Sequence, residues 1–596
     1  MVKELKQTWD LDAIFPGGSD SPEFAKYLDN LEQQIEIFSK ELKPGFGQDK
    51  ARFLDVVERV QDISKKLRHA SAFVSCLGAQ DVHDTKARIL AGRVKQIAAS
   101  FAQILATFDD ELLEIPDEQW AKLIEETDSL KEIAFNLSER RERAKEMLSP
   151  EQEQLVSKLS VNGYHGWSDL YDLTSGRMTI EVEINGEKLV MSPGQVSNRM
   201  SDPDPSVRSY LMETWENAWS EASDYCGMAL NQLAGFRLNL YEARGWKSVL
   251  KEPLLMNRMN EDTLDTMWHT VDSNKEGLVR YLRRKKEYLG LEKLGWQDID
   301  APIGKATSKL TYDEAARFIV EQFERFNPDM ARFAERAFID RWIESEDRPG
   351  KRMGGFCTSF PENKQSRIFV TFSGSLGNMA TIAHELGHGF HQHLVFELPV
   401  LAQQYAMNVA ETASTFAEII VADAAVKYAK DPEEKLMLLD DKLSRAVALL
   451  MNIQSRFLFE TRFYEERKQG IVSTQRLNEI MLQAQKEAFR DTLDVYHPHF
   501  WASKLHFYNT GVPFYNFPYT FGFLFSAGVY AKALEEGPSF REKYASLLRD
   551  TGRMKVEDLA KKHLGVDLTR PEFWEASINL VTGDLDAFME MTSEKN

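Results

Sequence analysis

Two histidines and a glutamate in the run His384-Glu385-Leu386-Gly387-His388 have the types and the spacing for metal chemistry. Residues four apart on a helix share one face, so both imidazoles can reach a single metal ion. Glu385 follows the first histidine directly, which places it to accept a proton from a water molecule activated by that metal. The pattern predicts a metal site with its own general base.

The helix that carries this run is expected between Asn378, as its N-cap, and Pro399, just past its end. Glycine inside a helix costs about 1 kcal/mol relative to alanine, so Gly387 indicates that something must approach the backbone closely there. The histidines His384, His388 and His391 are expected on one face. The opposite, buried face is predicted from apolar side chains at helical spacing: Met379, Ile382, Leu386, Phe390 and Leu394.

Catalytic zinc usually takes three protein ligands and leaves a fourth position for water. His391, His393 and Glu411 are the candidates for the third ligand. His391 follows His388 too closely for three ligands from one straight helix to reach tetrahedral geometry, and His393 points towards the apolar face. The small residues around Glu411 suit packing against another helix, which favours Glu411.

A second helix is expected from Gln403 to about Tyr428, after a break at Pro399. Glu411, Ser414 and Glu418 fall on one of its faces, at spacings of three and four. A carboxylate behind a metal-bound imidazole commonly orients the ring. Glu418 is the residue expected to do this.

The composition is that of an ordinary globular protein, with 28% charged and 43% hydrophobic residues. A net charge of −20 argues against nucleic acid and anionic membrane surfaces as partners. The three cysteines are far apart, which suggests neither a disulfide framework nor a thiolate metal site. With no apolar signal segment at the start, the expected location is cytoplasmic.

Two further patterns bear on the organisation of the chain. Residues 22–148 have charged helical periodicity, and residues 178–191 alternate around Asn185-Gly186, which predicts a β-hairpin with a type I′ turn. We expect an N-terminal helical domain at 1–195 and a catalytic domain at 196–596. Residues 366–372 read as a strand, with 354–357 as its hairpin partner, that either pairs with an extended substrate or only packs the metal helix.

Taken together, these motifs resemble those of oligoendopeptidase F and its thimet-oligopeptidase relatives. The resemblance rests on 384–388 followed by 410–416, on residues 9–15 and 298–303, and on a late loop of histidine and tyrosines. It implies a mainly α fold, a large helical metallopeptidase with a deep substrate channel and a small β-sheet next to the HExxH helix. It further implies one Zn²⁺ per chain, held with Glu411 as third ligand, and an endopeptidase that hydrolyses internal bonds of short unstructured peptides.

The same resemblance implies that a late histidine and tyrosines stabilise the transition state. His506 and Tyr515 are the expected residues, as donors to the oxyanion, with Tyr519 and Tyr508 behind them. Gly511-Val512-Pro513 separates His506 from Tyr515, which leaves the choice among the three tyrosines open. His497 and His499, two apart in a non-helical stretch, are expected to be structural.

Two other functions fit the same residues. One is a metallo-exopeptidase of the carboxypeptidase type on a similar helical frame. The other is a non-enzymatic helical peptide-binding scaffold, against which Glu385 counts, because a silent site needs no general base. Oligomeric state and side-chain preference have no signature in the sequence.

Overall fold

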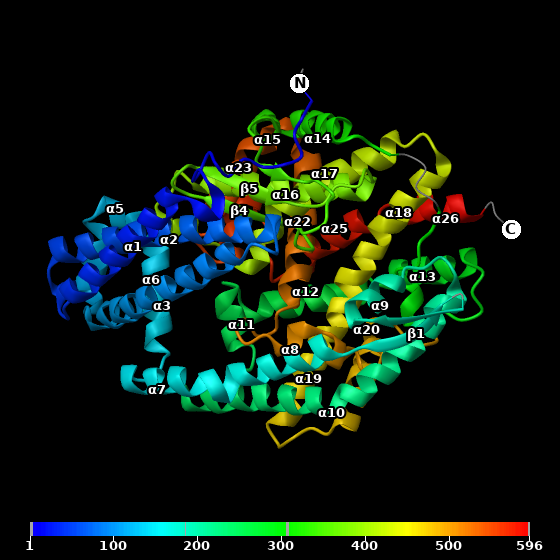
Figure 1. Ribbon diagram of the computed structural model, residues 1–596, viewed down its shortest axis with the longest axis horizontal. Coiled ribbons are helices and arrows are strands. Elements are labelled where there is room, and N and C mark those ends of the chain that lie inside the picture. The colour runs from blue at the N-terminus through cyan, green and yellow to red at the C-terminus, as the bar shows by residue number, and fades with distance from the viewer. Residues whose placement is uncertain (1–3, 185, 305–308, 594–596) are drawn as a thin grey trace. The chain divides into compact units, whose positions relative to one another are not determined.

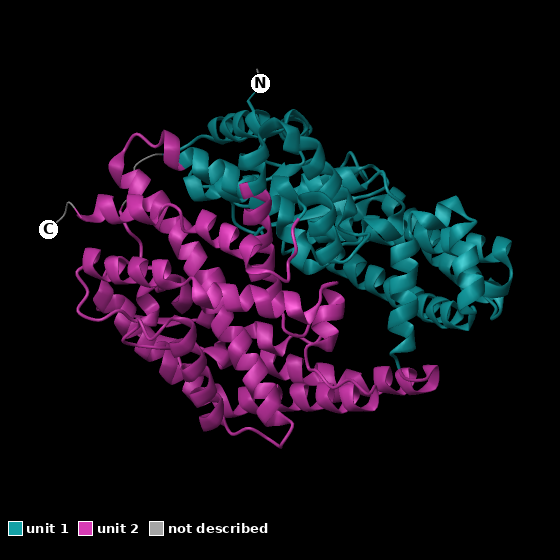
Figure 2. Ribbon diagram, turned by 180° about the vertical axis from the view of Figure 1, so that it is seen from behind, with its two compact units in different colours: residues 1–147, 308–425, 532–565 teal, residues 148–307, 426–531, 566–596 magenta. Residues whose placement is uncertain are grey.

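The computed structural model describes residues 4–184, 186–304 and 309–593, and it is mainly helical (Figure 1). The chain forms two compact units, each of which collects three separate segments (Figure 2). Unit 1 comprises 1–147, 308–425 and 532–565, and unit 2 comprises 148–307, 426–531 and 566–596. The domain boundary expected at residue 195, between an N-terminal and a catalytic domain, stays a prediction.

Unit 1 contains the metal helix and a three-stranded sheet. Its elements are α1 Pro22–Glu41, α2 Lys50–Gln80, α3 Thr85–Glu114, α4 Asp117–Glu125, α5 Asp128–Lys131, α6 Ala134–Lys145, α14 Tyr312–Phe326, α15 Pro328–Ile339, β3 Ile343–Glu344, β4 Phe356–Phe360, β5 Gln365–Phe369, α16 Leu376–Val395, most of α17 Met407–Tyr428, α23 Phe540–Asp550 and α24 Val556–Leu564.

Unit 2 contains the hairpin and the late aromatic loop. Its elements are α7 Pro150–Ser160, α8 Gly166–Arg177, β1 Ile180–Ile184, β2 Glu187–Met191, α9 Pro193–Arg199, α10 Pro205–Ala243, α11 Lys251–Met256, α12 Glu261–Ser273, α13 Glu276–Tyr288, α18 Pro432–Val447, α19 Ile453–Arg467, α20 Thr474–Ala488, α21 Phe500–Ser503, most of α22 Phe517–Glu536, α25 Pro571–Val581 and α26 Leu585–Ser593.

Helix starts follow local capping chemistry. Ser21 caps α1 by accepting from the Phe24 N–H, and Pro22 takes the first helical position, where a missing N–H costs nothing. Thr311 and Glu314 form a capping box at α14. Among the residues that the structure describes, none of the helices is long and apolar enough to cross a membrane.

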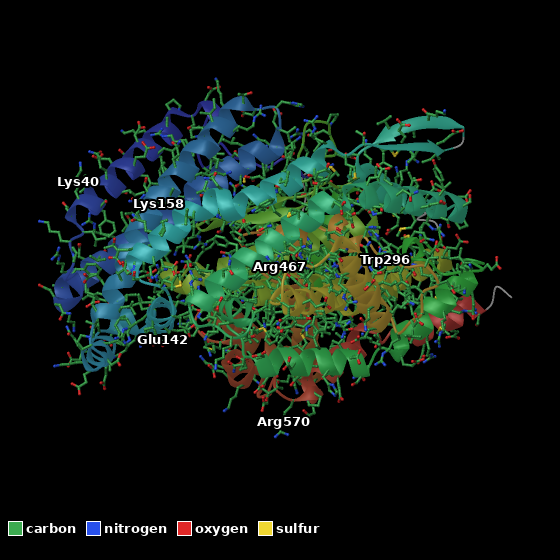
Figure 3. All side chains as sticks on the ribbon, turned by 90° about the horizontal axis from the view of Figure 1, so that it is seen from below. Lys40, Glu142, Lys158, Trp296, Arg467 and Arg570 are labelled. Carbon is green, nitrogen blue, oxygen red and sulfur yellow. The ribbon has the colours of Figure 1, made fainter. Side chains whose placement is uncertain are left out.

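The predicted hairpin is confirmed, since β1 pairs antiparallel with β2 and Ile180 lies opposite Met191. Gly186 has φ +80°, as a type I′ turn requires. Asn185, the other central residue of the predicted turn, lies outside the described residues. In the same unit Arg467, labelled in Figure 3, ends α19. Its guanidinium lies so close to Gly235 of α10 that a Cβ there would overlap it.

The sheet of unit 1 confirms the predicted strands but corrects one idea about them. Its order is β3-β5-β4, with β3 parallel to β5 and β4 antiparallel to it. Residues 366–372 cannot add a substrate strand as expected, because β5 is central and Val370 N–H and Phe372 N–H bond onward to Glu344 O and Ser345 O. The two edge strands are β3 and β4, and β4 is the longer of them.

Candidate metal centre

The N-cap of the metal helix α16 lies three residues before the predicted position. Its N-cap is Ser375, whose Oγ accepts from the Asn378 N–H at 3.1 Å, so Asn378 lies in the first turn instead of capping it. The Asn378 side chain turns back to accept from the Ser373 N–H. The predicted apolar stripe is buried, from Met379 to Leu394. It packs α16 against the rest of unit 1, where β4, β5 and α23 are its neighbours (Figure 1).

Gly387 is the point where α17 crosses α16. A Cβ on Gly387 would lie 2.4 Å from Ala413 O and 2.6 Å from Ser414 Cα. Only glycine allows two helix backbones to approach so closely. This approach brings Glu411, two residues before Ala413, opposite the two histidines, and it confirms the reason predicted for the glycine.

His384, His388 and Glu411 form the cluster that could hold a metal ion. Their three ligand atoms lie within 4.8 Å of one another. Glu411 Oε2 is 3.2 Å from His384 Nε2 and 3.6 Å from His388 Nε2. Two imidazole nitrogens and one carboxylate oxygen are the donor set of many catalytic zinc sites, so the residues fit the ion that the resemblance implies.

Two side chains of α17 orient the cluster from behind. Glu418 Oε2 lies 2.9 Å from His384 Nδ1. A carboxylate only accepts, so Nδ1 carries the proton and the Nε2 lone pair faces Glu411 and the metal position. The Ser414 hydroxyl donates to Glu411 Oε2 at 2.8 Å. The expected role of Glu418 therefore has the required geometry.

The ionisable groups of the cluster are shifted in different directions. Burial would raise the pKa of Glu411, but the His384 hydrogen bond and the fields of both histidines lower it to about 2. Burial, followed by the neighbouring His384, lowers the pKa of His388 to about 4. Glu411 is thus held as a carboxylate and His388 as a neutral ring, which are the forms that bind metal.

Glu385 is buried beside the cluster with one oxygen unpaired. Only 7% of the residue is exposed, and its Oε2 has no hydrogen-bond partner among the described residues. Burial raises the pKa of Glu385 to about 7, and the Glu411 charge adds to the shift. A Cβ on Gly355, just before β4, would lie 3.3 Å from Glu385 Oε1. The carboxylate therefore sits between α16 and the start of the edge strand.

His391 does not share the metal face, contrary to the prediction. Three residues past His388 is a rotation of about 300°, which turns the ring towards α23. There its Nε2 lies 3.1 Å from Leu548 O and 2.8 Å from Thr551 Oγ1. His393 packs against Phe333, so neither histidine joins the cluster.

The late-loop residues His506, Tyr515 and Tyr519 belong to unit 2, and they are neighbours there. The His506 and Tyr515 rings are 4.8 Å apart, and the Tyr519 hydroxyl donates to Tyr515 Oη at 3.2 Å. Tyr519 already lies in the first turn of α22, so the loop is shorter than expected. Tyr508 is fully buried and stacks on Tyr171 at 3.6 Å, which removes it from the candidates.

Two residues behind His506 had no signal in the sequence. Asn516 Oδ1 lies 2.8 Å from His506 Nδ1 and accepts from Arg456 Nη1 at 2.9 Å. Arg456 comes from α19, far away in the chain, and neither residue belongs to a recognisable motif. His497 and His499 instead bind the two oxygens of Glu216, as their expected structural role requires.

Fold and cluster together define a mainly helical metallopeptidase built around an HExxH helix. The family model described as Peptidase family M3 matches residues 199–580, and the one described as Oligopeptidase F matches residues 111–180. The chain belongs to peptidase family M3, as an endopeptidase of the oligoendopeptidase F type.

Related sequences and solved structures match this chain over nearly its whole length. It is 22% identical to an oligoendopeptidase F homolog of Lactococcus lactis over 99% of this chain and 98% of that protein. It is 23% identical to oligopeptidase PepF of Bacillus subtilis over 99% and 88%. The crystal structure of oligoendopeptidase-F from Enterococcus faecium has a TM-score of 0.72 at 20% identity, covering 97% of this chain and 100% of that one. A Chlamydophila abortus crystal structure reaches 0.85 at 17% identity over 98% of both chains.

Proposed function

We propose that the chain binds one zinc ion through His384, His388 and Glu411 and hydrolyses internal bonds of short unstructured peptides. The observation that supports this best is the pairing of a complete ligand set with a buried acid whose Oε2 has no partner, Glu385. A metal site kept only for stability has no need of a buried carboxyl group with an unused oxygen. The free Oε2 of Glu385 is available to accept a hydrogen bond from a water molecule.

When bound, zinc would polarise the scissile carbonyl and lower the pKa of water. Glu385 takes the proton of the attacking water and later delivers it to the leaving amine. Its raised pKa, about 7, suits both steps, because a group that titrates near neutral pH can accept and release a proton. Glu418 and Ser414 hold His384 and Glu411 in place throughout.

The late-loop residues divide their roles according to their hydrogen bonds. Arg456 can only donate, so the atom of Asn516 that faces it is the carbonyl Oδ1. His506 Nδ1 lies 2.8 Å from that oxygen and 3.4 Å from Arg456 Nη1, and the shorter contact makes Nδ1 a protonated donor to Oδ1. Burial lowers the pKa of His506 to about 4, so its ring is neutral at pH 7 and Nε2 is an acceptor. We assign donation to the oxyanion to Tyr515, supported by Tyr519, and assign to His506 acceptance of a substrate N–H, in place of the donor role expected from the sequence.

The substrate backbone is expected to lie beside β4. This strand is the longer of the two edge strands of its sheet, and Gly355 just before it adjoins Glu385. An extended peptide could add a strand there through main-chain hydrogen bonds. The deep channel implied by the resemblance would restrict such binding to unfolded chains.

The test is cleavage of an internally quenched peptide that is blocked at both ends. An endopeptidase cleaves it, whereas a carboxypeptidase of similar fold requires a free C-terminus and a binding scaffold leaves it intact. Cleavage should disappear with a chelator and return with one equivalent of zinc per chain. In the Glu411→Ala variant, zinc measured by metal analysis should fall well below one equivalent; undiminished zinc would remove Glu411 from the ligand set.

A further inference from the structure

Arg68 of α2 is a partly buried cation without a counterion. Its Nη1 donates to Gln403 Oε1 at 3.0 Å, and its Nη2 donates to Ser359 Oγ at 3.2 Å and to Gln392 Oε1 at 3.5 Å. These partners are all neutral, and over residues 4–184, 186–304 and 309–593 no carboxylate pairs with this guanidinium. The chain has 93 acidic against 73 basic residues. Buried charges are normally paired, so a missing acid in such an acidic protein calls for an explanation.

The guanidinium lines a cavity of about 470 Å³ between α2, α3 and β4. Arg68 is the one charged residue among the described residues of its wall. The other polar groups are mainly hydroxyls, which can donate hydrogen bonds to an anion; they come from Ser64, Ser71, Ser75, Thr358 and Ser359. A positive charge surrounded by hydroxyl donors fits a carboxylate.

The cavity adjoins the path proposed for the substrate. Thr358 and Ser359 belong to the edge strand β4, and Gln392, which Arg68 contacts, lies one helical turn after His388 on α16. Gly355, next to Glu385, precedes these strand residues by three and four positions. At about 3.4 Å per residue, this separation is roughly 10–14 Å along a strand. A peptide beside β4 would place a residue three or four positions from its scissile bond at the cavity.

We propose that this cavity binds a carboxylate of the peptide substrate, three or four residues from the scissile bond, with Arg68 as its partner. The inference rests on the proposed function in one respect, because it assumes that the peptide substrate lies along β4. Two sources can supply the group, an Asp or Glu side chain or the C-terminal carboxylate. Both would form the bidentate pair that a guanidinium prefers.

The experiment uses matched quenched peptides with a mapped scissile bond. In one series Glu replaces Gln at each position within four residues of that bond, and in the other the C-terminus is a free acid or an amide. Because a hydrogen bond to a charged group is worth about tenfold to hundredfold in binding, one series should show a preference of that size in kcat/KM. A preference confined to one position identifies a side chain, and a preference for the free acid identifies the C-terminus.

Substitutions then assign the preference to Arg68. Arg68→Gln should abolish it while neutral peptides are cleaved as before, and Arg68→Lys should keep part of it. Arg59→Gln, on the same helix in a surface pair with Glu41, should leave it unchanged. The melting temperature of Arg68→Gln should be equal or slightly higher, because a partly buried cation without a counterion is removed.

The inference would be overturned if neither series showed a preference for the acid, or if the preference survived Arg68→Gln. It would also be overturned if Arg68→Gln lowered kcat/KM equally for acidic and neutral peptides and lowered the melting temperature, because Arg68 would then have a structural role. The same peptide pairs are also titrated calorimetrically against the Glu385→Gln variant, so the carboxylate preference is read without cleavage. Failure of the wild type to cleave any peptide would count against the proposed function and not against this site.

Discussion

Glu385 is buried and Glu411 is partly buried, both close to the same histidines, yet their pKa values move in opposite directions. Glu411 accepts hydrogen bonds and faces two imidazoles, which outweigh burial and lower its pKa to about 2. Glu385 has an unpaired oxygen, and burial raises its pKa to about 7. Environments that separate two carboxyl groups in this way also separate their roles, here a metal ligand and a proton carrier.

At the residue scale, the ring of His506 provides a spectroscopic prediction. In the wild type, Nδ1 should be protonated and Nε2 unprotonated at pH 7, and the ring should stay neutral until the pH approaches about 4. Asn516→Asp should raise the pKa of His506, because a carboxylate favours imidazolium. Nitrogen-15 spectra of histidine-labelled protein report both. A proton on Nε2 of the neutral wild-type ring would contradict the assigned acceptor role.

Only part of the site could be predicted from local sequence patterns. Helical spacing places His384 and His388 together, and the small residues near Glu411 indicate a packed helix, because local sequence determines both. Arg456 and Asn516 could not be found in this way. Their effect on His506 arises from contacts between segments far apart in the chain, and an arginine or asparagine in isolation has no pattern.

At the element scale, the crossing of α16 and α17 at Gly387 yields a stability prediction. Gly387→Ala gains about 1 kcal/mol of helix propensity, but its Cβ would overlap Ala413 O, and overpacking costs about 1–3 kcal/mol. The overlap should win, lowering both the melting temperature and zinc affinity, because Glu411 moves with α17. Calorimetry and chelator competition measure the two effects.

Gly377→Ala is the matched control in the same helix. Its Cβ would meet only Ser375 Oγ at 3.8 Å, an ordinary contact. This variant should be as stable as the wild type or slightly more stable, with unchanged zinc affinity. Equal behaviour of the two alanine variants would show that the helices do not depend on Gly387 for their approach.

The packing of α16 on α23 predicts sensitivity to acid. Burial lowers the pKa of His391 to about 3, below the 6.5 of an unfolded histidine. The unfolded chain therefore binds the extra proton first, so this contribution to stability is complete above pH 6.5 and is lost as the pH falls towards 3, on the order of a few kcal/mol. His391→Gln, which can still donate to Leu548 O, should flatten the melting temperature over this range. An unchanged acid slope would contradict the assignment.

The strands could be predicted from the sequence, but their order in the sheet could not. Alternation identified the hairpin of 178–191, and β-rich composition with a turn at 361–364 identified the strand pair within 354–372. The central place of β5 could not be predicted. Its second neighbour, β3, is only two residues long, too short for any pattern of alternation. A substrate strand was therefore expected at the wrong position of the sheet.

At the scale of the whole molecule, the family resemblance implied a mainly helical protein, in agreement with the helical periodicity of residues 22–148, but neither predicted how the segments group. Each compact unit collects three stretches from across the chain. Helical pattern depends on neighbours a few residues apart, whereas grouping depends on surfaces hundreds of residues apart. The linear boundary at 195 therefore stays a prediction.

The channel implied by the family should make the enzyme discriminate by the state of its substrate. A short peptide taken from a stable folded protein should be cleaved, while the same segment within the native protein stays intact. Binding an extended chain requires that chain to be unfolded and then orders it. Mass spectrometry of both digests measures the difference. Equal cleavage of the segment in both contexts would exclude a closed channel.

The most direct test of the central claim combines zinc content and turnover in one sample of the Glu385→Gln variant. Glutamine keeps the shape of the side chain but cannot carry a proton between water and the leaving amine. We predict one zinc per chain, as in the wild type, and hydrolysis of the end-blocked peptide slower by about 10²–10⁴-fold. Hydrolysis near the wild-type rate with zinc retained would contradict the assignment of Glu385 as the general base.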